Sequence, residues 1–215
     1  MCCFEGVVFD LDGTLIDSVW AHSISWVKAF EANGFSARIN EVEPLIGLGG
    51  RRIVEYLLGE KGLTLFPVLA SYKNRVYLGL VENVNLFPGV KQTLLDLREK
   101  GIKTALATST VSEVLPKVLG RFQLEQFFNS IVSGDKIIRG KPDPEIFLKA
   151  FEMIQVDPRY GAIVGDTKYD IIPATNIGAT SILVSHGRRT HLAIEPDYLI
   201  GELDDLLEVF EDPLS

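Results

Sequence analysis

The sequence predicts an α/β protein: a parallel β-sheet covered by helices, with an all-helical domain inserted after the first strand. Short apolar, β-branched runs alternate with amphipathic helical segments over most of the chain, and this alternation is typical of a parallel sheet. Between residues 17 and 85 only helical patterns occur, so the alternation is interrupted there. A chain of 215 residues, 47% of them hydrophobic, is long enough to bury such a core together with an insert.

The first strand is expected over residues 5–11 (EGVVFDL), a β-branched and aromatic run that leads into a turn at Asp12-Gly13. A helix is expected from Asp17 to about residue 33, because apolar residues recur there at helical spacing. Three further helices are expected within the insert, over residues 41–46, 51–61 and 69–84.

From residue 86 onward, strands and helices alternate again. Helices are expected over residues 90–100, 113–119, 144–153, 168–176 and 203–210, and strands over residues 102–107, 130–133, 162–164 and 180–184. We therefore divide the chain into a core of residues 1–16 and 86–215 and an inserted helical domain of residues 17–85. The basic tract 185–191 is expected to be a surface loop, and Trp20 and Trp26 are expected to pack inside the insert.

Composition narrows the classes of function. The chain has 21 Lys and Arg against 29 Asp and Glu, a net charge of −8, so we expect no nucleic-acid partner. No apolar run approaches the roughly 18 residues that cross a bilayer, so no membrane partner is expected. Residues 1–9 lack the basic region and cleavage site of a secretory signal, and the two cysteines, Cys2 and Cys3, are adjacent. These features predict a cytoplasmic protein without disulfides.

Polar side chains that can perform chemistry fall at the carboxyl ends of the expected strands. In an open parallel sheet, ligands bind beyond those ends. The sequence therefore predicts that four carboxylates and one ammonium meet at one edge of the sheet. The residues are Asp10 and Asp12 after the first strand, Thr108 and Ser109 after the second, Asp166 and Asp170 after the fourth, and Lys141 in a loop before a helix.

Such a cluster of carboxylates needs a cation. Two like charges about 4 Å apart cost roughly 4 kcal/mol at an effective dielectric constant near 20. Mg²⁺ relieves this repulsion, since it prefers oxygen ligands. A phosphate group then fits the site, because Mg²⁺ and Lys141 neutralise it while Thr108 and backbone amides donate hydrogen bonds. Asp10 would be a nucleophile that forms an aspartyl-phosphate, and Asp12 would act as acid and base.

The order of these residues resembles the four motifs of the haloacid dehalogenase superfamily, in its phosphatase form. The segment DLDGTLIDS at residues 10–18 is similar to the first motif, and Thr108 after a hydrophobic strand is similar to the second. Lys141 in GKPDPE is similar to the third motif, and Gly165-Asp166 with Asp170 is similar to the fourth. The resemblance covers essentially the whole chain. It implies a Rossmann-like core, a helical cap inserted after the first motif, and Mg²⁺-dependent phosphoryl transfer.

The resemblance also implies a role for each residue. Asp10 is expected to be the nucleophile, Asp12 the acid and base, and Thr108 and Lys141 the residues that bind phosphate. Metal ligands are expected to be Asp10, Asp166 and the main-chain carbonyl of Asp12, together with Asp170 either directly or through water.

Three further residues are candidates for substrate binding. Arg51 follows the glycine-rich segment 47–50, where members of the superfamily place a substrate-specificity loop; the alternative is a solvated helix start. His22 lies on the first helix of the insert and is expected to face the site, although a structural or exposed histidine is the alternative. Ser109 is expected to bind substrate beside Thr108, with helix capping as its alternative.

The leading prediction is a phosphatase that acts on a small phosphorylated metabolite, such as phosphoglycolate or a sugar phosphate, because a closing cap excludes macromolecules. A β-phosphoglucomutase-type phosphomutase is the alternative, since His22 and Arg51 fall near cap positions of that branch; Thr14 argues against it, because that branch commonly carries an aliphatic residue there. A catalytically inactive scaffold of the same fold is the non-enzymatic alternative. A monomer or small homo-oligomer is expected.

Overall fold

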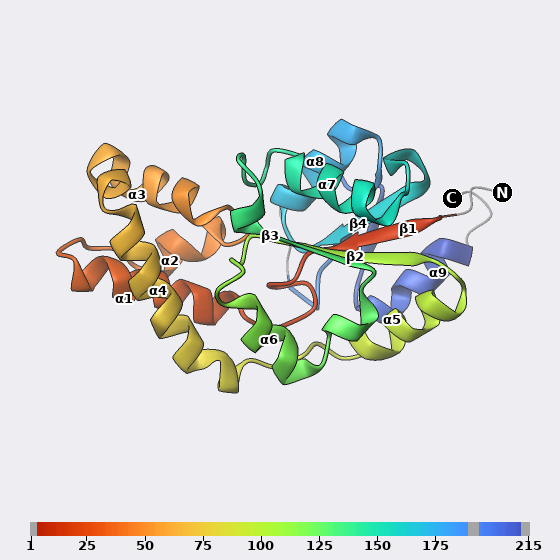
Figure 1. Ribbon diagram of the computed structural model, residues 1–215, viewed down its shortest axis with the longest axis horizontal. Coiled ribbons are helices and arrows are strands. Elements are labelled where there is room, and N and C mark those ends of the chain that lie inside the picture. Colours follow the sequence, from red (N-terminus) through yellow and green to blue (C-terminus); the bar gives the residue numbers. More distant parts are fainter. Residues whose placement is uncertain (1–3, 189–193, 212–215) are drawn as a thin grey trace.

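A single parallel sheet forms the centre of the computed structural model, which describes residues 4–188 and 194–211 (Figure 1). Its strand order is β3-β2-β1-β4-β5-β6, and every neighbouring pair is parallel. This order places β1 inside the sheet, between β2 and β4. The strands are β1 (Gly6–Phe9), β2 (Lys103–Thr108), β3 (Ser130–Ser133), β4 (Gly161–Gly165), β5 (Thr180–Val184) and β6 (Tyr198–Ile200).

Helices cover both faces of this sheet, as Figure 1 shows. One face packs against α5 (Val90–Glu99), α6 (Leu115–Phe122) and α9 (Leu206–Glu211), and the other packs against α7 (Glu145–Ile154) and α8 (Lys168–Ile177). In β1, Val7 and Phe9 belong to the first of these apolar layers and Val8 to the second, as the alternation of side chains along a strand requires. The expected Rossmann-like α/β fold is confirmed.

The insert between β1 and α5 consists of helices joined by loops. It consists of α1 (Val19–Ala32), α2 (Ile39–Val42), α3 (Gly50–Thr64) and α4 (Phe66–Leu80), and residues 17–85 contribute no strand to the sheet. These helices enclose an apolar cluster of their own, which includes Trp26, Phe30 and Leu69. Figure 1 shows them gathered to one side of the sheet, beyond the carboxyl ends of the strands.

Two short linkers join the insert to the sheet, and they run side by side. Ile16 and Leu86 form an antiparallel bridge. On either side of it, the Asp17 N–H donates to the Asn85 carbonyl at 2.8 Å, and the Phe87 N–H donates to the Leu15 carbonyl at 3.0 Å. The chain therefore leaves and re-enters the core at nearly the same place.

The structure differs from the sequence prediction at several places. The helix expected over residues 41–46 is α2, followed by a 3-10 turn over Glu43–Leu45. Trp20, expected to pack inside the insert, packs instead against the apolar cluster on the α5, α6 and α9 face of the sheet. Strand β1 covers Gly6–Phe9 and is shorter than the expected 5–11, because the chain turns at Leu11, whose carbonyl accepts hydrogen bonds from the N–H groups of Thr14 and Leu15. Strand β6 was not predicted, since three residues show no periodicity. The basic tract 185–191 is not simply a surface loop: His186 is buried, with its Nε2 donating to the Thr14 carbonyl at 2.9 Å. Residues 189–191 of that tract, like Cys2 and Cys3, lie outside the described residues.

Candidate active site

The turn after β1 carries the first motif and lies at the carboxyl edge of the sheet. The N–H of Asp10 donates to the Val164 carbonyl of β4 at 2.9 Å, so the strand pairing extends to this residue. At Gly13 the chain adopts φ +91°, which favours glycine, and a Cβ there would overlap the Asp166 carboxylate. Glycine at this position therefore lets the ends of β1 and β4 approach each other closely.

Lys141 is the buried cation of the site. Its Nζ donates to Asp10 Oδ1 at 2.5 Å and to Asp170 Oδ1 at 2.7 Å, and its side chain is fully buried. Burial lowers the pKa of Lys141, but the attraction of Asp10 and Asp170 outweighs burial and raises it above its usual range. The second oxygen of Asp170 accepts hydrogen bonds from the Thr167 N–H and hydroxyl. Asp170 therefore has both oxygens engaged, and it positions Lys141 against Asp10.

The positive charge near Asp10 does not offset the burial of its carboxylate. Burial raises the pKa of its carboxyl to about 7; Lys141 opposes this shift, and repulsion from Asp170 and Asp12 adds to it. Burial, with repulsion from Asp170 and Asp10, also raises the pKa of Asp166 well above its usual range, although Arg188 lies 3.8 Å from that carboxylate. The pKa values of these carboxyls are raised first by their burial and then by their mutual repulsion.

These acidic residues fit a divalent cation. Asp10, Asp166 and Asp170 each offer an oxygen, and the three atoms lie within 4.8 Å of one another. Three carboxylates face one ammonium, so a hard cation with oxygen ligands would relieve the repulsion. Asp10 and Asp166 would hold it most directly, since both oxygens of Asp170 already accept hydrogen bonds.

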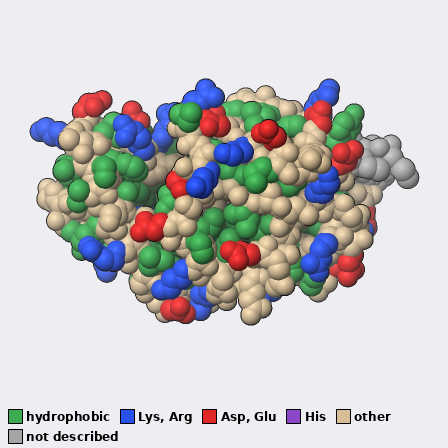
Figure 2. Space-filling model, viewed as in Figure 1, with side chains coloured by type: hydrophobic (Ala, Val, Ile, Leu, Met, Phe, Trp, Pro, Cys, Tyr) green, Lys and Arg blue, Asp and Glu red, His purple; other side chains and the backbone are tan. Residues whose placement is uncertain are grey.

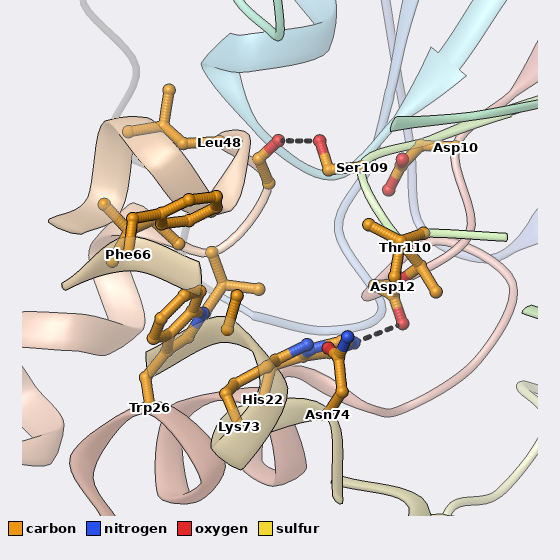
Figure 3. Close-up of a pocket in the computed structure, with 16 residues that line it drawn as sticks. Asp10, Asp12, His22, Trp26, Leu48, Phe66, Lys73, Asn74, Ser109 and Thr110 are labelled. Carbon is orange, nitrogen blue, oxygen red and sulfur yellow. Dashed lines mark hydrogen bonds and ion pairs between the residues drawn. The ribbon is translucent and has the colours of Figure 1, made fainter. Parts of the chain in front are cut away.

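Asp12 lies in a very different environment, made of hydroxyl groups and a histidine. Its Oδ1 accepts from Ser18 at 2.7 Å and from His22 Nε2 at 2.8 Å, and its Oδ2 accepts from Thr110 at 2.7 Å and from Thr108 at 3.3 Å. Burial alone would raise the pKa of Asp12, but the His22 contact and these hydrogen bonds lower it below its usual range. Asp12 is therefore ionised in this arrangement. Figure 3 shows its carboxylate directed towards His22.

Behind His22, the insert supplies a stack of aromatic rings and one ammonium. The His22 ring lies 3.9 Å from the Tyr77 ring, and the Tyr77 hydroxyl lies 3.4 Å from Asp12 Oδ1. The Lys73 ammonium lies 4.8 Å from the centre of the Tyr77 ring and 5.9 Å from that of Trp26. Burial lowers the pKa of Lys73 to about 8, with Asp12 opposing the shift. Lys73 is thus a buried cation beside the reacting end of the site.

A cavity of about 630 Å³, including its mouth, opens between the insert and the sheet. Asp10, Asp12 and Thr110 line it from the sheet, and His22, Lys73 and Asn74 line it from the insert (Figure 3). Six apolar residues of the insert, which we call the apolar wall, line the rest of that side. They are Trp26, Ile46, Leu48, Ile53, Phe66 and Ala70.

The structure places the other predicted residues as follows. His22 faces the cavity. Thr108 is fully buried and bonded to Asp12. The Ser109 hydroxyl donates to the Gly47 carbonyl at 2.8 Å, so it connects the sheet to the insert. Arg51 is exposed and does not line the cavity, in contrast to the expectation, because the side chain leaves α3 on the solvent side.

The sequence prediction missed Thr110 and Lys73. Thr110 could have been found, because it follows Thr108 and Ser109 at the end of β2. Lys73 gave no such signal: it lies within α4, and only the packing of that helix against α1 turns it towards Asp12.

The comparisons agree with this geometry. The model of the haloacid dehalogenase-like hydrolase family matches residues 7–184. The chain belongs to this family. It is 32% identical to a phosphoglycolate phosphatase of Vibrio cholerae over 94% of this chain and 95% of that protein. It is 27% identical to the pyrophosphatase PpaX of Bacillus mycoides over 94% of this chain and 95% of that protein.

Solved structures of this family share the fold. A hydrolase from Pseudomonas syringae superposes with a TM-score of 0.87 at 25% identity, covering 98% of this chain and 100% of that one. The prediction that the chain is an enzyme of the phosphatase branch of the superfamily is confirmed. In residues 4–188 and 194–211 of this hydrolase, no helix combines the length and apolar character needed to span a membrane. On the face shown in Figure 2, basic and acidic side chains are interspersed.

Proposed function

We propose that this hydrolase is a Mg²⁺-dependent phosphatase that cleaves a small phosphorylated metabolite through an aspartyl-phosphate on Asp10, with residues 17–85 acting as a cap. The observation that carries the proposal is the contrast between two aspartates two residues apart. Asp10 lies in an acidic cluster against Lys141, whereas hydroxyl groups and His22 hold Asp12 ionised. Paired acids in opposite environments are typical of a division of chemical roles.

In the first step, a carboxylate oxygen of Asp10 attacks phosphorus, and the bond from phosphorus to the substrate oxygen breaks. The alcohol leaves with a proton donated by Asp12, which must first take up that proton as the negatively charged phosphate binds beside it and raises its pKa. Lys141 binds and orients the phosphate beside Asp10, to which it already donates at 2.5 Å. Mg²⁺, held by Asp10 and Asp166, would supply the positive charge that favours ionised Asp10 and balances the phosphate.

In the second step, Asp12 takes a proton from a water molecule, whose oxygen attacks phosphorus and releases inorganic phosphate from Asp10. Asp12 is ionised in the structure, as a group that accepts a proton must be. His22, Ser18 and Thr110 orient that carboxylate, and two of these three residues come from the insert side of the first linker. The insert therefore contributes to the acid and base as well as to the walls of the cavity.

The substrate is expected to be small, since the cavity is bounded by the cap. Phosphoglycolate is the first candidate, because the relative from Vibrio cholerae is named a phosphoglycolate phosphatase. Sugar phosphates are the second candidate. Lys73 takes the role that the sequence suggested for Arg51, as a cap cation for an anionic group on the leaving part of the substrate. His22 and Ser109 would border the same path.

Phosphate release from phosphoglycolate, measured with and without EDTA, tests the proposal. EDTA should abolish turnover and added Mg²⁺ should restore it. Asp10→Asn should lower kcat by several orders of magnitude, since it removes the nucleophile. Near-normal turnover by Asp10→Asn, or full activity in EDTA, would contradict the mechanism. Conversion of a sugar 1-phosphate to the 6-phosphate without release of phosphate would favour the phosphomutase instead, and a lack of turnover on every ester would favour the inactive scaffold.

A further inference from the structure

Apolar side chains form most of the cap side of the cavity. The apolar wall combines two aromatic and four aliphatic side chains, drawn from α1, α3, α4 and the segment between α2 and α3. The wall is continuous, because Gly50 places no side chain between the rings of Trp26 and Phe66. A Cβ at Gly50 would lie 2.8 Å from Trp26 and 3.6 Å from Phe66. Figure 3 shows Leu48, Phe66 and Trp26 together, across the cavity from Asp10.

Most polar side chains that line the cavity already make hydrogen bonds within the protein. Among the side chains that line the cavity, the Asn74 amide donates to Glu113, the Ser109 hydroxyl donates to the Gly47 carbonyl, and His22 and Thr110 bind Asp12. Lys73 has ring faces as its neighbours, at 4.8 and 5.9 Å. A leaving group with several hydroxyls would give up its hydrogen bonds to water on binding, and the apolar side chains of the wall would not replace them.

We propose that the site selects phosphate monoesters whose alcohol carries an apolar body, either aromatic or branched aliphatic, over polyol phosphates. The proposal rests on the proposed phosphatase function and narrows its substrate class, since it ranks sugar phosphates below esters of apolar alcohols. With the phosphate against Lys141 and Asp10, the alcohol extends towards the wall, since the wall lies across the cavity from Asp10 (Figure 3). A two-carbon alcohol such as glycolate leaves most of the wall uncovered, and Lys73 then provides its single charged contact.

Part of the apolar wall is accessible from the cavity and is not covered by the packing of the cap helices. Trp26, Ile46 and Ile53 are buried among the cap helices, whereas Leu48, Phe66 and Ala70 are half-buried and keep part of their surface towards the cavity. An apolar group that covers this surface gains binding energy in proportion to the area removed from water. The expected gain is about fourfold in kcat/KM for each methylene group that reaches the wall.

The test is a series of alkyl phosphates, assayed for phosphate release in Mg²⁺. Ethyl, propyl, butyl, 3-methylbutyl and 2-phenylethyl phosphate have alcohols of similar acidity, so their intrinsic reactivity is nearly constant. We expect kcat/KM to rise about fifteenfold from ethyl to butyl phosphate. Glycerol 3-phosphate, a polyol close in size to butyl phosphate, should fall below it by a similar factor.

Phe66→Ala should reduce the rise of kcat/KM along the series. The ratio of kcat/KM for 2-phenylethyl phosphate to that for ethyl phosphate should fall about tenfold. Leu48→Ala, a milder change on the same wall, should lower that ratio less. The ratio is measured on one sample, so a loss of folded enzyme cancels from it. Val68→Ala, on α4 but 54% exposed and outside the cavity, is the matched control and should leave the ratio unchanged.

The outcomes separate the two proposals. If kcat/KM did not rise along the alkyl series while phosphoglycolate was hydrolysed and Mg²⁺ was required, the apolar preference would be overturned. The proposed phosphatase function would still stand. A slope that Phe66→Ala and Leu48→Ala do not change would also overturn it, since the selectivity would then come from elsewhere. No release of phosphate from any ester would overturn the phosphatase function itself, and the inference with it.

Discussion

Replacing Lys141 with methionine would remove the ammonium between Asp10 and Asp170 and keep a side chain of similar length. Because Lys141 is fully buried, two buried carboxylates would be left without their cation. Removing one partner of a buried ion pair costs about 3–5 kcal/mol of unfolding free energy. In a chain of 215 residues, that loss lowers Tm by roughly 6–20 °C.

Urea unfolding, followed by tryptophan fluorescence in EDTA at pH 5 and pH 8, measures this loss. Protonated carboxyls need no cation, so the loss should be smaller at pH 5. Mg²⁺ should restore part of the stability at pH 8, because it takes the place of the missing charge. Lys149→Met is the control: this lysine is exposed on α7, and its Nζ donates to the Lys136 carbonyl, so a change within about 0.5 kcal/mol is expected. A Lys141→Met loss equal at both pH values would refute the electrostatic argument.

Two further outcomes follow from the charges of the site. In EDTA, the unfolding free energy of the parent protein should fall as pH rises from about 4 to about 7, because the folded state holds the Asp10 proton with a pKa of about 7 against an ordinary 3.8; a urea titration that shows a rise over this range would contradict it. Lys73→Met should lower kcat/KM for phosphoglycolate roughly 10- to 150-fold, equivalent to about 1.5–3 kcal/mol for one hydrogen bond to a charged group. Arg51→Ala should change that kcat/KM less than twofold, and equal losses in both variants would show that the cap cation is misassigned.

The core of the site could be predicted from the sequence because strand ends converge whatever the details of packing. Asp10, Thr108 and Asp166 each follow a short apolar run, and parallel pairing brings those three ends to one edge. Lys141 lies in a loop before a helix, so no strand end fixes its position, and its resemblance to a motif adds to the prediction that it joins the site. Its complete burial between two carboxylates appears only in three dimensions.

The cap was predictable as a set of helices but not in its orientation. Helical periodicity shows which residues share a face, yet it does not show which face meets the sheet. The glycines before Arg51 therefore suggested a cation at the site, whereas the packing of α1 on α4 brings Lys73 there and leaves Arg51 in solvent. The same limit applies to Trp26, which packs inside the cap as expected and also borders the cavity.

The pairing of the two linkers has a consequence for how this fold can diversify. Ile16 and Leu86 lie opposite each other, so the whole segment between them begins and ends at one point of the core. An exchange of that segment for another of any length requires no change in the spacing of the strands, because loop closure depends only weakly on length. Such an exchange changes the substrate specificity and keeps the chemistry, provided that the new segment again supplies hydrogen-bond donors to Asp12, as Ser18 and His22 do here.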